Sequence, residues 1–105
     1  MTRSKFTKTD GLITGFSTDG HAGAGEQGYD VVCAAVSSAV YLTANTVTEI
    51  YRCKAELEER DGHLGLRLTA DDAARCQPAL QGLLLHLKEL QKQYPDHLQV
   101  RIDGQ

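Results

Sequence analysis

The chain has 105 residues, which is enough for one domain with one hydrophobic core and too few for two. Its formal net charge of -3 at pH 7 argues against direct nucleic-acid binding, because such proteins normally present a basic face. We find no apolar run near the length of a membrane span and no apolar segment typical of a secretory signal, so we expect a cytoplasmic protein without a membrane anchor.

The chain is predicted to begin with a β-hairpin. Residues 3–9 and 12–18 alternate in polarity on either side of Asp10-Gly11, a favoured two-residue hairpin turn. One face of the second strand is expected to carry Leu12, Thr14 and Phe16.

A glycine-containing loop over residues 19–29 is expected to lead into a helix over residues 30–50, with Asp30 as its N-cap. The helical spacing comes from an apolar stripe formed by Val32, Val36, Val40, Thr43, Val47 and Ile50. Many residues of this helix are β-branched and lower its intrinsic propensity, so the helix depends on being buried.

The second half predicts another hairpin, a second helix and a last strand. Residues 51–58 alternate strictly, with Tyr51, Cys53, Ala55 and Leu57 expected on the inner face, and the Asp61-Gly62 turn leads to a strand containing Leu64, Leu66 and Leu68. Thr69 and Asp72 resemble a capping box, and Pro78 either kinks the following helix or begins its main part after a short turn. Residues 98–103 alternate again as a strand.

The element order is therefore β-β-α-β-β-α-β, and nearly every strand has one apolar face. This favours an α+β fold: a two-layer sandwich with a mostly antiparallel five-stranded sheet and two helices on one face. Residues 1–105 are expected to form this single domain.

The start of the first helix carries the chemistry. With Asp30 as N-cap, Cys33 is the third helical residue, where unpaired N–H groups and the helix dipole favour a thiolate. His21, in the preceding loop, is a candidate general base, and the free N–H groups are candidate oxyanion donors. Ser37 and Asp30 share the cysteine's side of the helix, so Ser37 is a candidate thiolate or substrate donor. Asp30 either orients His21 or only caps the helix.

The same residues also have simpler explanations. Cys33 fits a small buried hydrophobic residue, and a histidine in a glycine loop is often only a loop residue. Three cysteines without CxxC spacing indicate reduced thiols, and no His/Cys set has zinc spacing, so no metal is expected. The glycines at 23, 25 and 28 match a dinucleotide fingerprint, but the surrounding βαβ unit is missing, so no cofactor is expected.

Two stretches resemble the bacterial ribosomal-processing cysteine proteases (Prp, YsxB-like). They are Gly20-His21-Ala22 and Gly28-x-Asp30-Val31-Val32-Cys33-Ala34-Ala35-Val36-Ser37, and a looser likeness covers the whole chain. The resemblance implies a His/Cys dyad, with His21 as base and Cys33 as nucleophile. Asp30, Ser37, Gly20 and Gly28 are then expected to support the dyad or bind substrate.

The resemblance also implies a homodimer and a substrate. That substrate is the N-terminal extension of large-subunit ribosomal protein number twenty-seven, which the family removes during ribosome maturation. A second hypothesis from another class is a ribosome-associated module that binds a peptide with the same surface and does not cleave it. Selective alkylation of Cys33 would favour the enzyme.

Overall fold

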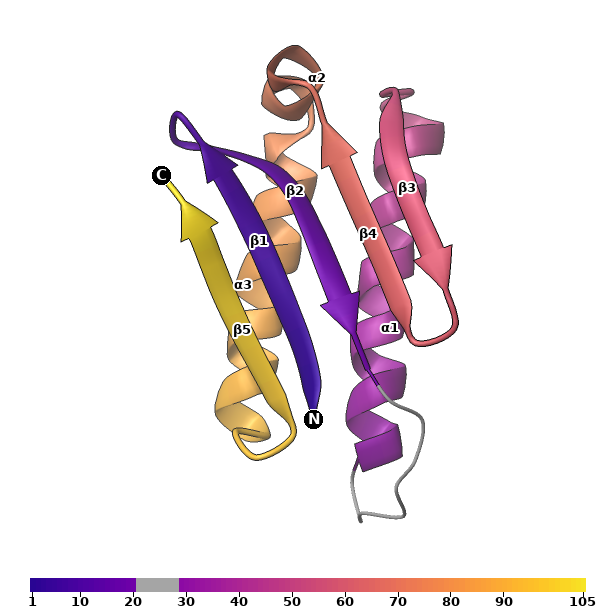
Figure 1. The fold of residues 1–105 in the computed structure, drawn as a ribbon, viewed down its shortest axis with the longest axis vertical. Coiled ribbons are helices and arrows are strands. Elements are labelled where there is room, and N and C mark those ends of the chain that lie inside the picture. The colour runs from indigo at the N-terminus through magenta and orange to yellow at the C-terminus, as the bar shows by residue number, and fades with distance from the viewer. Residues whose placement is uncertain (21–28) are drawn as a thin grey trace.

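The computed structural model describes residues 1–20 and 29–105, apart from the side chains of Tyr29 and Asp30. Five strands form one sheet in the order β3-β4-β2-β1-β5, and the long helices cover one of its faces (Figure 1). The strands are β1 (Thr2–Thr9), β2 (Leu12–Asp19), β3 (Ala55–Arg60), β4 (His63–Leu68) and β5 (Leu98–Gly104). The helices are α1 (Tyr29–Asn45), α2 (Ala70–Arg75) and α3 (Gln77–Gln93), and a π-helical turn, η1 (Thr46–Ile50), follows α1.

The α+β architecture expected from the sequence is confirmed, with one refinement. Three strand pairs are antiparallel, but β5 runs parallel to β1, so the sheet is mixed. A parallel pair requires a crossover connection, and here the chain returns through α2 and α3 before β5 joins the far edge beside β1.

The first hairpin contains a β-bulge that the alternation in the sequence did not reveal. The register of β1 on β2 shifts after Thr7, and Thr14 is the extra residue. Ile13 and Phe16 are therefore both buried against the helices. The expectation that Leu12, Thr14 and Phe16 share one face is wrong, because an inserted residue reverses the alternation.

Helix α1 and the π-helical turn η1 that follows it bury the valine stripe that the spacing predicted, with Val47 in the turn. Val32, Val36, Val40 and Val47 are all fully buried in the core. Ile50 is an exception, with 76% of its surface exposed, because the π-helical turn alters the angular spacing at the end of the helix.

The segment Val31–Ile50 is long and apolar enough to cross a membrane, judged by length and composition alone. This corrects the expectation that no run approaches a span, although the core helix of a soluble protein meets the same criterion. Here the valine stripe packs into the core beneath the sheet, whereas Val31, Leu42 and Ile50 of the same segment are exposed, and 33% of the segment is buried.

The second hairpin begins later than expected. Arg52 has a positive φ of 57°, so the chain turns before Cys53 and becomes extended only at Ala55. Leu57 pairs with the buried Leu66 and so lies on the inner face, as expected, but it is 54% exposed because β3 is the edge strand of the sheet. The expected inner face of β4 is confirmed, since Leu64, Leu66 and Leu68 are buried.

The second helical segment breaks near Pro78. Helix α2 ends at Arg75, and α3 begins at Gln77 with the proline in its first turn, where a missing N–H costs nothing. The Thr69 hydroxyl accepts a hydrogen bond from the Asp72 N–H at 3.4 Å, as its capping pattern predicted.

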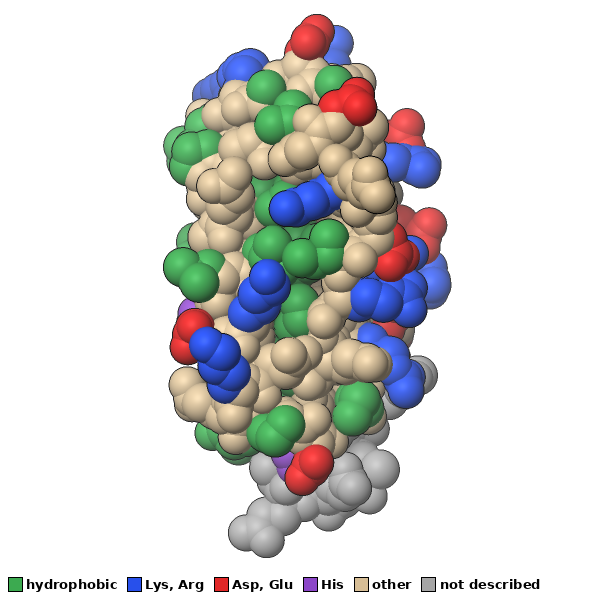
Figure 2. All heavy atoms as spheres, turned by 90° about the vertical axis from the view of Figure 1, so that its left-hand side faces the viewer, with side chains coloured by type: hydrophobic (Ala, Val, Ile, Leu, Met, Phe, Trp, Pro, Cys, Tyr) green, Lys and Arg blue, Asp and Glu red, His purple; other side chains and the backbone are tan. Residues whose placement is uncertain are grey.

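Features beside the free edge of β5 oppose its pairing with a strand of another chain. Figure 2 looks onto this edge, where apolar side chains line the middle of the molecule and basic side chains lie across them. The Val100 N–H, which points away from β1, donates to Gln91 Oε1 of α3 at 2.5 Å. A satisfied edge amide and nearby charges both oppose pairing with another strand.

Candidate active site

The candidate site lies at one end of the sheet, where β1 and β4 begin, β2 ends and α1 starts (Figure 1). A cavity of about 280 Å³ opens there. Its lining comprises Thr2, Thr18, Gly20, Cys33, Ser37, Val40, Tyr41, Arg60, Asp61, Gly62, His63 and Leu64. Among the residues that the structure describes, strand ends, the β3–β4 turn and the first turns of α1 form the walls.

Cys33 presents its thiol to this cavity and is only partly exposed. Its Sγ lies 3.1 Å from the hydroxyl oxygen of Thr2, the first residue of β1. Gly20 approaches from the end of β2 so closely that a Cβ at that position would lie 3.4 Å from the sulfur. A larger residue than glycine at position 20 would compete with substrate for the space around the thiol.

Gly20 is itself held in place by the β3–β4 turn. Its N–H donates to the Gly62 carbonyl at 2.9 Å. Gly62 has a φ of +75°, and a Cβ added there would lie 2.5 Å from the Gly20 carbonyl oxygen. Only glycine satisfies both the backbone conformation and the close approach. The Asp61-Gly62 turn, predicted as a hairpin connection, thus also fixes one wall of the site.

Two further side chains of α1 line the same wall as Cys33. Ser37 and Tyr41 follow it at four-residue intervals, which places all three on one side of the helix. The Tyr41 hydroxyl donates to Glu59 Oε2 of β3 at 2.7 Å and ties the wall to the edge strand. Sequence reasoning had selected Ser37 but missed Tyr41, although the same spacing points to it.

The start of α1 differs from the sequence expectation. The helix begins at Tyr29, so Asp30 is its second residue and not its N-cap, and Cys33 is the fifth residue and not the third. The Cys33 N–H is then within the regular helical hydrogen-bond pattern, beyond the free groups of the first turn. Helical side chains tilt toward the N-terminus, so the thiol still points back toward the helix start.

Two predicted site residues, His21 and Gly28, lie outside the described residues. Among the described histidines, His63 borders the cavity, but its ring is engaged elsewhere. Its Nδ1 lies 2.5 Å from Asp19 Oδ1, and its Nε2 lies 3.1 Å from Glu58 Oε1. Leu64 faces the helices, so the alternation of β4 turns His63 to the opposite face of the sheet, away from Cys33.

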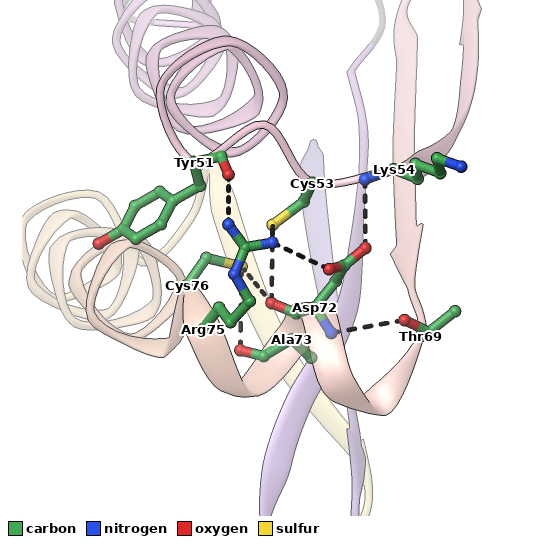
Figure 3. Close-up of polar contacts among 8 residues, drawn as sticks. All are labelled: Tyr51, Cys53, Lys54, Thr69, Asp72, Ala73, Arg75 and Cys76. Carbon is green, nitrogen blue, oxygen red and sulfur yellow. Dashed lines mark hydrogen bonds and ion pairs between the residues drawn. The ribbon is translucent and has the colours of Figure 1, made fainter.

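The other two cysteines are structural. Figure 3 shows Cys53 and Cys76 gathered around the carbonyl oxygen of Asp72, to which both thiols donate, at 3.7 and 3.3 Å. Burial and the neighbouring Cys53 raise the pKa of the Cys76 thiol to about 11. Arg75 lies 3.6 Å from the Cys53 sulfur and also donates to the Tyr51 carbonyl, which ties this corner together. The raised pKa makes the Cys76 thiol a poor nucleophile, and Cys53 is buried and does not line the cavity, whereas Cys33 does.

The described part of the chain offers no metal centre. Within residues 1–20 and 29–105, no cluster of three or more His, Cys, Asp or Glu residues is arranged to hold a metal ion.

Residues 1–99 match the model of the family described as cysteine protease Prp. The chain is 26% identical over 93 residues to a ribosomal processing cysteine protease Prp from Staphylococcus aureus, covering 87% of this chain and 88% of that protein. It is 29% identical over 94 residues to the Bacillus subtilis protein of the same name, covering 84% of each.

Solved structures are similar over nearly the whole chain. The S. aureus Prp protease in complex with a substrate peptide superposes with a TM-score of 0.89 at 25% identity, covering 98% of this chain and 100% of that one. The same protease with a covalently linked product peptide gives a TM-score of 0.84 at 26% identity, with the same coverage.

Proposed function

The chain belongs to the cysteine protease Prp family and is a cysteine protease; from this premise we propose that Cys33 is its nucleophile and His21 its general base. The observation that carries the proposal is the partly exposed Cys33 thiol, which faces a cavity whose walls are fixed by strand ends. The two remaining cysteines are buried in another part of the core.

The position of Gly20 supports His21 as the base. His21 is joined by a peptide bond to Gly20, and consecutive Cα atoms are about 3.8 Å apart. Gly20 approaches the Cys33 sulfur closely, since a Cβ added to this glycine would lie 3.4 Å from Sγ. The sequence therefore attaches a histidine directly to a point beside the thiol.

The proposed reaction is amide hydrolysis through a thioester. His21 takes the thiol proton, the Cys33 sulfur attacks the substrate carbonyl carbon, and the carbonyl oxygen becomes an oxyanion. The carbon–nitrogen bond breaks as His21 passes the proton to the leaving amine. Water, deprotonated by His21, then attacks the thioester and releases the acid and the thiol. The free N–H groups at the start of α1 are the proposed oxyanion donors.

Supporting roles follow from position. Ser37 lines the cavity one helical turn beyond Cys33, where its hydroxyl can donate to a substrate carbonyl. Asp30, in the first turn of α1, is proposed to interact favourably with the helix dipole and to orient His21. Gly20 and Gly28 are proposed to leave room for the peptide backbone.

We propose that the substrate is the N-terminal extension of large-subunit ribosomal protein number twenty-seven. The support is the activity of the relatives, which are ribosomal processing proteases, and the substrate peptide bound to one of them. A ribosomal protein precursor is made in the cytoplasm, so the enzyme is proposed to act there without binding nucleic acid or membrane.

A homodimer is also proposed. Its support is a set of large apolar side chains exposed on the helical layer, namely Val31, Leu42, Ile50 and Leu85. Sedimentation at increasing protein concentration tests this directly. A species of single-chain mass at all concentrations would exclude the dimer without affecting the assignment of the dyad.

The decisive experiment is cleavage of the precursor ribosomal protein, followed by mass spectrometry. Wild type is expected to make one cut at the end of the extension, and Cys33→Ala and His21→Ala are expected to lose it. His86→Ala is the matched control, because His86 is an exposed residue of α3 outside the proposed site. No cut by wild type, together with slow alkylation of Cys33, would favour a binding module. No cut with a reactive Cys33 would instead indicate a different peptide substrate.

A further inference from the structure

Three buried hydroxyl groups lie on the face of the sheet that packs against the helices, and two of them, those of Thr2 and Thr18, belong to residues that line the cavity. Thr2, Ser4 and Thr18 are 1%, 2% and 9% exposed. A strand face that packs on helices ordinarily carries hydrocarbon, as Phe6 does on the same face of β1. The hydroxyls therefore require hydrogen-bond partners in the interior.

Two of these hydroxyls satisfy each other, and the third does not join them. Ser4 Oγ and Thr18 Oγ1 are 3.0 Å apart, across the β1–β2 pair. Thr2 Oγ1 lies 3.1 Å from the Cys33 sulfur. The Thr2 hydroxyl is thus hydrogen-bonded to the Cys33 thiol, which faces the cavity.

We propose that Thr2 is a positioning residue for the Cys33 nucleophile, donating its hydroxyl proton to the sulfur when Cys33 is ionised. This rests on the proposed role of Cys33. In the neutral pair either group can be the donor, because each has one proton. The thiolate has no proton to give, so in the ionised state the hydroxyl must donate. That bond is charge-assisted, so it favours the ionised sulfur over the neutral one.

The backbone of Thr2 is held firmly enough for this role. Its N–H donates to the His97 carbonyl at 2.9 Å, and it pairs with Leu98 at the start of β5. Threonine has few accessible χ1 rotamers, so a fixed backbone also fixes the hydroxyl. Gly20 closes the other side, since a Cβ there would lie 3.4 Å from both the Thr2 oxygen and the Cys33 sulfur. The sulfur is thereby confined between a donor below and the end of β2.

The test removes and restores the hydroxyl. Thr2→Val keeps the shape and deletes the donor, Thr2→Ser keeps the donor, and Thr2→Ala provides a second deletion in case valine disturbs folding. Thr43→Val is the matched control, because Thr43 is a buried threonine of α1 whose hydroxyl donates to the Ala39 carbonyl of its own helix, at 2.9 Å. Circular dichroism and a denaturant titration confirm that each variant is folded.

The principal readout is the rate of Cys33 alkylation by iodoacetamide against pH, with each site resolved by mass spectrometry. In Thr2→Val and Thr2→Ala the midpoint of this curve is expected to move up by about one pH unit, as for a lost charge-assisted hydrogen bond. Peptide cleavage is expected to show kcat reduced about tenfold with KM nearly unchanged. Thr2→Ser and Thr43→Val are expected to behave as wild type.

The outcomes distinguish failure of the proposed role of Thr2 from failure of the proposed role of Cys33 as the nucleophile. A midpoint and kcat unchanged in Thr2→Val, with wild-type Cys33 still reactive and proteolysis intact, would overturn the role of Thr2 and leave the nucleophile assignment standing. Equal losses in Thr2→Val and Thr2→Ser would also overturn it, because the hydroxyl would then not be the cause. If wild-type Cys33 neither alkylates selectively nor supports cleavage, the assignment of Cys33 itself fails, and the role of Thr2 fails with it.

Discussion

Gly62→Ala tests whether the β3–β4 turn positions the candidate site. The substitution places a Cβ 2.5 Å from the Gly20 carbonyl oxygen, whereas ordinary contact begins near 3.4 Å, so one of the two segments must move by about 0.9 Å. Alanine at a φ of +75° costs about 1–2 kcal/mol, and weakening the Gly20–Gly62 hydrogen bond costs about 1 kcal/mol more.

The control for this prediction is Gly11→Ala. Gly11 has a similar φ of +82°, but a Cβ added there meets nothing within 4 Å. Gly11→Ala should therefore lose only the conformational part, about 1–2 kcal/mol. The additional loss in Gly62→Ala, about 1 kcal/mol or more, corresponds to a further fall in Tm of about 4–8 °C by thermal denaturation.

Activity separates the two variants more sharply. Gly20 lies beside the Cys33 thiol, since a Cβ added to it would be 3.4 Å from the sulfur, and it precedes His21. A shift of nearly 1 Å should therefore lower kcat/KM by about 10- to 100-fold in Gly62→Ala. Gly11 lies at the other end of the hairpin, and Gly11→Ala should retain kcat/KM when assayed well below its Tm. Equal activities of the two variants would refute the view that this turn aligns the site.

Three further predictions concern stability. Gln77→Met should lower the free energy of unfolding, measured in urea, by about 2–4 kcal/mol. The Gln77 amide binds both the N–H and the C=O of Ile13, at 3.1 and 2.7 Å, beyond the end of the β2–β4 pairing. A loss below about 1 kcal/mol would mean that water replaces the Gln77 amide. The pKa of the Cys76 thiol is about 11 in the folded protein against an ordinary value of 9.0. The contribution of this thiol to the free energy of unfolding is therefore fully present below pH 9 and is lost as the pH rises to 11. Over that range the urea midpoint should fall less steeply with pH in Cys76→Ala than in wild type. Gln91→Leu should destabilise by about 1 kcal/mol and promote concentration-dependent association in light scattering, since it releases the Val100 amide at the sheet edge, whereas Gln91→Glu keeps an acceptor and should not associate.

Several elements were predictable because local chemistry determines them. The hairpin turn at Asp10-Gly11 has two positive φ angles, 51° and 82°, which aspartate and glycine tolerate. The valine stripe of α1 and the leucine alternation of β4 followed their periods into the core. The break at Pro78 followed from its missing N–H. The family could also be recognised from the sequence, because the motif around Cys33 that carries the resemblance lies within one continuous stretch.

Features that depend on a second segment could not be predicted in this way. The bulge at Thr14 depends on how β2 pairs with β1, and the exposure of Leu57 depends on β3 being an edge strand. The start of α1 one residue before Asp30 moved Cys33 from the third to the fifth helical position, which no capping rule for isolated helices anticipates.

Residue type and spacing along the chain were enough to specify the elements, the two-layer arrangement and the identity of the candidate nucleophile. The surroundings of the thiol depend instead on how distant segments pack. Thr2, Gly20, Gly62 and Cys33 come from four separate segments, and their contacts exist because β1, β2 and the β3–β4 turn meet at the same end of the sheet as the start of α1. Strand order and register set those distances, and neither is written in the local pattern of any one segment.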